Sequence, residues 1–114
     1  MQPAINNLLA NLPSALSGEV FETITTSETV CIERIVSNGQ STPNDTWYDQ
    51  ERSEWVLVVS GSADLLFEDA QEARRLMAGD YTLIPAGCRH RVTWTDPTVQ
   101  TVWLAVHFAA NPPQ

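Results

Sequence analysis

Residues 79–90 read Gly-Asp-Tyr-Thr-Leu-Ile-Pro-Ala-Gly-Cys-Arg-His and carry the clearest structural signal in this chain of 114 residues. The two glycines can adopt the positive φ angles that tight turns require. The proline cannot donate a hydrogen bond to a neighbouring strand, so it marks the end of a strand over Tyr81–Ile84. A new strand follows over Arg89–Thr95, and its alternation predicts that His90 and Trp94 share a face. We therefore expect His90 on the wall of a pocket.

Outward from this stretch, short alternating runs recur between turn-forming residues. The most strand-like run is Glu54–Ser60, which is apolar on both faces except for Glu54. About eight or nine such runs, with turn signals every ~8–12 residues, are typical of an all-β sandwich or barrel. We predict one domain over residues 1–114, with an antiparallel β-barrel over about 30–108 and a lead-in over 1–18. In that lead-in, Ala4–Asn11 has apolar residues at helical spacing and predicts a short helix.

The composition argues against several classes of partner. The net charge is -8 and the isoelectric point is near 4.4, whereas nucleic acids and anionic membrane surfaces require clustered basic residues. The sequence contains no lysine, which excludes Schiff-base chemistry. The two cysteines, Cys31 and Cys88, do not form a disulfide framework, and no apolar run is long enough to span a membrane. We expect a cytoplasmic protein with no membrane partner.

Two groups of residues resemble the paired motifs of the cupin superfamily. The second motif is matched position for position by Gly79, Pro85, Gly87 and His90, with Trp94 at the place of its asparagine. The end of the first motif is matched by Glu54 and Gly61. The resemblance implies a small cupin-like barrel, a double-stranded β-helix of the jelly-roll type.

The sequence departs from that pattern where the first motif has two histidines. Depending on the spacing, these positions hold Tyr48 and Gln50, or Trp47 and Asp49. Of the three histidines and one glutamate that cupins usually bring together, only Glu54 and His90 remain.

Glu54 is expected to point into the barrel, where a carboxylate must be paired, protonated or bound to a metal. One hypothesis is a weak divalent-metal site of Glu54 and His90, helped by Asp49 or Gln50. Oxygen donors with one imidazole suit Mn or Fe, with Zn as a further candidate. The competing hypothesis has no metal, and pairs Glu54 with His90 or with Arg34.

Other residues could complete the pocket. Tyr48 and Trp94 are predicted to line it, and an inward-facing Arg34 would anchor a ligand that carries a carboxylate. His107 is expected on the outer face of its strand, because the opposite face, with Leu104 and Val106, is the more apolar one.

Three functions remain open from the sequence. The first is binding of a small molecule inside the barrel, with or without a divalent metal. The second, implied by the resemblance, is a metal-dependent enzyme of the dioxygenase, isomerase or decarboxylase type. The third is a structural or regulatory module with a vestigial pocket.

A homodimer is also predicted. Trp55, Leu57 and Val59 form an apolar row on the face opposite Glu54, and a barrel strand normally shows polar residues to solvent. A second copy of the chain would cover that row.

Overall fold

The structure, a computed structural model, describes residues 1–109, and within them all regular secondary structure is β. The strands are β1 (Val20–Thr26), β2 (Val30–Ser37), β3 (Ser53–Ser60), β4 (Ser62–Phe67), β5 (Arg74–Met77), β6 (Tyr81–Ile84), β7 (His90–Thr95) and β8 (Thr101–Phe108). The predicted all-β antiparallel fold is therefore confirmed. The strand predicted between the two turns of residues 79–90 is β6, with the bounds expected from the sequence.

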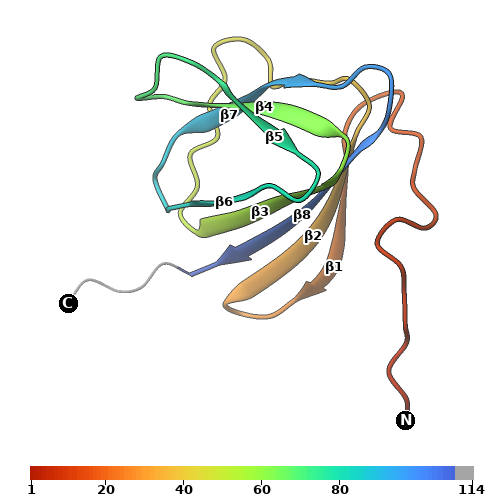
Figure 1. Cartoon of the computed structure of the whole chain (residues 1–114). Helices are drawn as coiled ribbons and strands as arrows, with labels where there is room; N and C mark the ends of the chain where they lie inside the picture. Colours follow the sequence, from red (N-terminus) through yellow and green to blue (C-terminus); the bar gives the residue numbers. More distant parts are fainter. Residues whose placement is uncertain (110–114) are drawn as a thin grey trace.

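The strands form two sheets that face one another (Figure 1). The larger sheet has the order β1-β2-β8-β3-β6, and the smaller has the order β5-β4-β7. All named pairings are antiparallel. The chain crosses from the larger sheet to the smaller one between β3 and β4, so these two consecutive strands contribute to opposite walls of the barrel.

Gly61 makes that crossing possible. Its φ is 85°, in the left-handed region that side chains disfavour. A Cβ atom at this position would lie 2.4 Å from Oγ1 and 2.7 Å from Cα of Thr101. Only glycine therefore allows β3 to turn into β4 so close to the start of β8.

The hydrophobic core lies between the two sheets. Its members come from both walls and include Val56, Val58, Leu65, Leu76 and Trp103, all at most 7% exposed. The alternation of buried residues along β3 matches the prediction that Glu54, Val56 and Val58 face inward. Buried polar residues accompany this core, and among them Glu54 and His90 line a cavity between the sheets.

The predicted helix over Ala4–Asn11 is wrong. The segment contains a turn at Leu8 and Leu9 and a bend at Ala10 and Asn11, and no regular structure before them. The side chain of Asn7 accepts a hydrogen bond of 2.8 Å from the main-chain nitrogen of Leu9, a local bond that competes with helical pairing. Arg34 donates to the carbonyl oxygens of Leu8 and Ala10 and so holds this non-helical segment against β2. An isolated helix this short is also marginal in water.

Among the residues that the structure describes, no helix is long and apolar enough to cross a membrane.

Candidate functional site

β3 carries Glu54 into the space between the sheets. Its neighbours across the strands are His107 of β8 and Ile84 of β6, so β3 is paired on both sides and its backbone is fixed. Glu54 is only 8% exposed. A carboxylate this deeply buried is costly unless polar groups compensate its charge. The groups around Glu54 therefore define the site.

His90 reaches Glu54 from the opposite sheet. It is the first residue of β7, and it follows a turn in which Cys88 N donates a hydrogen bond of 3.1 Å to the carbonyl oxygen of Pro85. Main-chain bonds of 2.8 and 3.1 Å to Tyr48 hold its backbone. Nδ1 lies 2.9 Å from the carbonyl oxygen of Cys88, so this nitrogen carries the proton that it donates. Nε2 faces Glu54, and lies 3.5 Å from its Oε1.

The pKa of His90 is set by opposing influences. Burial favours the neutral imidazole and lowers the pKa, but the contact with Glu54, the Cys88 carbonyl and the charge of Glu54 together outweigh it. The net result is a pKa raised above the ordinary 6.5. The imidazolium form is thus stabilised inside the barrel.

A second pair of the same kind lies beside the first. His107 Nε2 is 2.8 Å from Oε1 of Glu33 and 3.8 Å from Oε2 of Glu54. The expectation that His107 faces outward is wrong. On β8 the outer face is the more apolar one, because the inner face ends among the polar residues of the cavity. Apolar content alone therefore did not identify the inner face. For Glu33 a signal existed, because alternation along β2 places it with Ile35 on the face opposite Arg34.

These residues line a cavity of about 100 Å³. Its charged wall has three carboxylates, from Glu19, Glu33 and Glu54, together with both histidines of the chain. Apart from Gln50, aromatic and aliphatic side chains form the remainder, among them Phe21, Ile35, Tyr48, Val56, Val92 and Trp103. No arginine is among the lining residues that the structure describes.

Comparison with known proteins identifies the family. The sequence model of the Cupin domain matches residues 33–107, which is well over half of the chain. The chain belongs to the cupin family. No curated protein matches it.

Among solved structures, this cupin is similar to a "putative mannose-6-phosphate isomerase" from Ralstonia eutropha JMP134. The two are 46% identical, with a TM-score of 0.92, and the match covers 95% of this chain and 100% of the other. It shares its fold with an RmlC-like cupin from Desulfovibrio desulfuricans, at 19% identity, a TM-score of 0.72, and 93% and 97% coverage. It also shares the fold with a polyketide cyclase from Streptomyces resistomycificus, at 20% identity and a TM-score of 0.69, over 83% of this chain and 68% of that one.

The residues at the positions of the first-motif histidines of other cupins lie partly inside the cavity and partly outside it. Tyr48, predicted to line the pocket, and Gln50, predicted to help bind a metal, both lie on the cavity wall of this cupin. Asp49 is exposed and does not line it, so its prediction as a metal ligand is wrong. The segment is extended, and adjacent side chains then point to opposite sides. Burial, followed by the charge of Glu19, raises the pKa of Tyr48, so its phenol stays protonated at neutral pH.

Trp94 lies outside the cavity, and its prediction as a pocket residue is wrong. Between β4 and β7 the pairing passes from Leu65 with Val92 to Asp64 with Trp94, so β7 has one extra residue. Such a bulge inverts the alternation that follows it. Trp94 therefore turns outward, where the guanidinium carbon of Arg75 lies 4.2 Å from its ring centroid.

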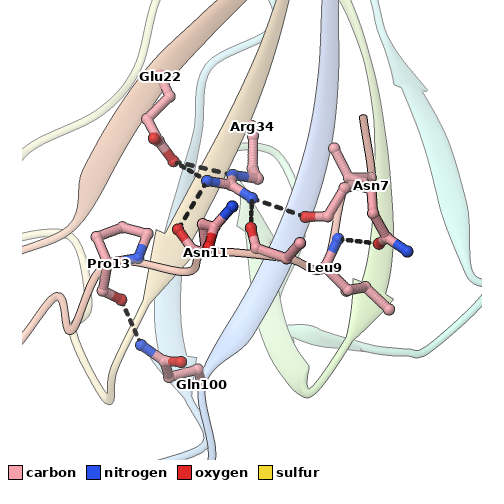
Figure 2. Close-up of polar contacts among 9 residues, drawn as sticks. Asn7, Leu9, Asn11, Pro13, Glu22, Arg34 and Gln100 are labelled. Atoms are coloured by element: carbon pink, nitrogen blue, oxygen red, sulfur yellow. Dashed lines mark hydrogen bonds and ion pairs between the residues drawn. The ribbon is translucent and has the colours of Figure 1, made fainter. Parts of the chain in front are cut away.

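Arg34 is also outside the cavity, contrary to the prediction that it anchors a ligand. It lies on the outer face of β2 at the centre of a group of polar contacts (Figure 2). It pairs with Glu22 at 2.8 Å and donates to the carbonyl oxygens of Leu8, Ala10 and Asn11. Its hydrogen-bonding capacity is used in fixing the segment before β1 to the sheet.

The cavity contains atoms of the kinds that bind metal ions. The imidazoles and carboxylates of the cavity supply chemically suitable atoms, but they are paired with one another at 2.8 to 3.8 Å. Within residues 1–109, no group of three or more His, Cys, Asp or Glu residues is arranged to hold a metal ion. The arrangement is that of one hydrogen-bonded pair, His107 with Glu33, and a longer contact between His90 and Glu54.

Proposed function

We propose that this cupin binds a small polar organic molecule in the cavity, with Glu54 and His90 as its main polar contacts. The observation that carries the proposal is the geometry of Glu54. Its contacts with imidazole nitrogens, 3.5 and 3.8 Å long, exceed the ordinary length of a hydrogen bond. A buried carboxylate with loose protein partners can accept stronger hydrogen bonds from a ligand.

The walls of the cavity support the same proposal. A binding site usually combines apolar walls with a few converging polar groups. Val56, Leu65 and Trp103 supply the apolar part, and the carboxylates and imidazoles converge on one side. At about 100 Å³ the cavity suits a molecule of only a few heavy atoms.

The substrate class in the name of the Ralstonia relative, a sugar phosphate, does not suit the charge of this cavity. A sugar phosphate carries two negative charges near neutral pH, and proteins hold phosphate with arginine, lysine or main-chain amides at a helix N-terminus. The lining residues include three carboxylates, and the sequence has no lysine. We therefore do not propose a phosphosugar as the ligand.

The second candidate is an enzyme that moves a proton, as an isomerase does. The contacts of Glu54 with both imidazoles favour it, because a carboxylate beside an imidazole can take a proton from a bound molecule and return it. The Cys88 carbonyl would keep the His90 ring in one orientation while Nε2 exchanges the proton. Exchange of solvent deuterium into a bound molecule would reveal this activity.

A divalent metal and a cytoplasmic location remain predictions from the sequence. Mn, Fe or Zn would take Glu54 and His90 as ligands, with Gln50 from the cavity wall. Metal analysis of tag-free wild-type protein and of the Glu54→Gln variant tests the prediction of a divalent metal.

We also propose a homodimer formed through the outer face of the larger sheet. Seven apolar residues form a continuous band across β2, β8, β3 and β6: Ile32, Leu104, Val106, Trp55, Leu57, Tyr81 and Leu83. Tyr81 and Leu83 are 66% and 56% exposed. A two-fold partner would use the same band and remove it from water.

The chain offers a direct test of cavity binding. Its two histidines both line the cavity, so the imidazole NMR signals of tag-free protein report on that cavity. A library of small polar compounds should contain molecules that shift both imidazole signals in a saturable way. These shifts should be lost in Glu54→Gln and retained in Glu68→Gln, an exposed surface variant. Binding that moves neither imidazole would contradict the proposal, and a complete lack of binders would favour a vestigial pocket.

A further inference from the structure

The charge of the cavity wall points to one class of ligand, and this inference rests on the proposed function. Glu33, His107 and Glu54 lie in a row across three neighbouring strands, β2, β8 and β3. His90 faces the end of this row from β7. Neither Glu33 nor His107 belongs to the two motifs that the sequence shares with cupins, so the motifs alone do not describe the row.

The row is deeply placed in the protein. The side chains of Glu54, His107 and Glu33 are 10%, 15% and 22% exposed. In an interior of low dielectric constant, the interaction between charges is several times stronger than in water. The sign of the charges on the cavity wall therefore decides which ligands can bind there.

Negative charge exceeds positive charge on the wall. Glu19, Glu33 and Glu54 supply three carboxylates, and the two histidines supply at most two positive charges. Glu19 is held by a hydrogen bond from the Ser37 hydroxyl, which in turn accepts a bond of 3.2 Å from Trp103 Nε1. No arginine is paired with Glu19, Glu33 or Glu54 among the ion pairs of residues 1–109.

Aromatic faces lie beside the carboxylates. Phe21, Tyr48 and Trp103 line the same cavity, and Phe21 is half exposed at its edge. Aromatic faces attract organic cations through the negative face of the ring. Aliphatic side chains nearby would contact a hydrocarbon portion of the ligand.

We propose that the cavity selects a small organic cation, an ammonium group on a short hydrocarbon. The ammonium nitrogen would donate to Glu54 and Glu33, and the hydrocarbon would contact the apolar wall. Glu54 meets the imidazoles only at 3.5 and 3.8 Å, so its oxygens can take shorter bonds from such a donor. A neutral ligand would leave the excess negative charge uncompensated, and an anion would be repelled.

Three probes of nearly equal size isolate charge from shape: propylammonium, 1-propanol and propionate. Each is titrated into tag-free protein at constant ionic strength, and the two imidazole signals are followed. Propylammonium should bind about tenfold more tightly than 1-propanol, as expected for a hydrogen bond to a charged group, and propionate should not bind. Equal binding of propylammonium and 1-propanol would overturn charge selection but leave the proposed function intact. If none of the three moves either signal, charge selection fails, whereas the proposed function fails only if the wider library of small polar compounds also moves neither signal.

Two variants assign the effect to the row. Glu33→Gln keeps the shape of the side chain and should weaken propylammonium binding about tenfold. Glu68→Gln makes the same change in net charge at a site that is 46% exposed, and should leave binding unchanged. Similar losses in both variants would show a general effect of net charge, and would contradict the proposal. A separate titration with MnCl₂ distinguishes a metal ion: saturable broadening of the imidazole signals by Mn²⁺ without any effect of propylammonium would overturn it.

Discussion

Adjacent residues on β2 have opposite surroundings. Arg34 faces outward and donates to Glu22 and to three carbonyl oxygens (Figure 2). Glu33 faces inward and meets a single partner, His107, beside a cavity. A charged group with a full set of hydrogen bonds holds structure together. A charged group with few bonds, in a cavity, is able to bind something else.

The largest effect is expected outside the cavity. Replacing Arg34 with methionine keeps the length of the side chain but leaves Glu22 and three carbonyl groups without their donor. The free energy of unfolding should fall by about 2–3 kcal/mol, measured by urea denaturation. Amides of residues 8–11 should exchange faster with solvent, while propylammonium binding is retained.

Arg89→Met is the matched control for Arg34→Met. The Arg89–Glu68 pair is 43% and 46% exposed, so its loss should cost less than about 0.5 kcal/mol. Equal costs for the two variants would refute the structural role assigned to Arg34.

The next effect concerns the outer apolar band. Leu83→Asp places a charge at its edge and should weaken self-association by about 2 kcal/mol, seen by sedimentation as a shift from dimer to monomer. Met77→Asp is the control, because Met77 is 53% exposed on the smaller sheet, away from the band. A wild-type monomer at micromolar concentration would contradict the dimer.

A smaller effect on stability, but a clear one on binding, is expected at Glu54. Glu54→Gln removes a buried charge whose protein contacts are loose, so the free energy of unfolding should change by less than about 1 kcal/mol. Propylammonium affinity should fall about tenfold. A large loss of stability would instead mark Glu54 as a structural residue like Arg34.

The smallest effect is a dependence of stability on pH. Because the pKa of His90 is raised above 6.5 in the folded protein, its contribution to stability is complete below that value. It should decrease as the pH rises through the folded pKa. The relevant neighbours are Glu54 from β3 and Tyr48, whose phenol remains protonated. Imidazole titration by NMR should give a midpoint above 6.5 that drops in Glu54→Gln; an unchanged midpoint would contradict the role of that contact.

The placement of the motif residues could be predicted from the sequence because their structural roles are local. A turn with Gly87 and Pro85 before a strand fixes where His90 begins its strand, and alternation along β3 predicts that Glu54 points inward. The meeting of Glu54 and His90 inside the barrel is therefore accessible from the sequence. Their pairing with Glu33 and His107 is not, since it depends on which strands are neighbours.

The wrong predictions for Trp94, Arg34 and His107 also come from contacts between segments that are distant in the sequence. Trp94 turned outward because of a bulge that arises from pairing between β4 and β7. Arg34 turned outward because β2 presents its other face to the cavity, and the segment before β1 supplied its carbonyl partners. His107 turned inward although its face is the less apolar one.

The sequence by itself determined the strands, the turns between them and the side on which Glu54 lies, because these follow from period-two alternation and from the backbone limits of glycine and proline. The tertiary structure decided the contents of the cavity. Segments far apart in the chain bring Glu19, Glu33, His107 and His90 to one cavity between the two sheets, and inter-strand register and bulges set which side chains face it. Register depends on all neighbouring strands at once, so no local pattern contains it.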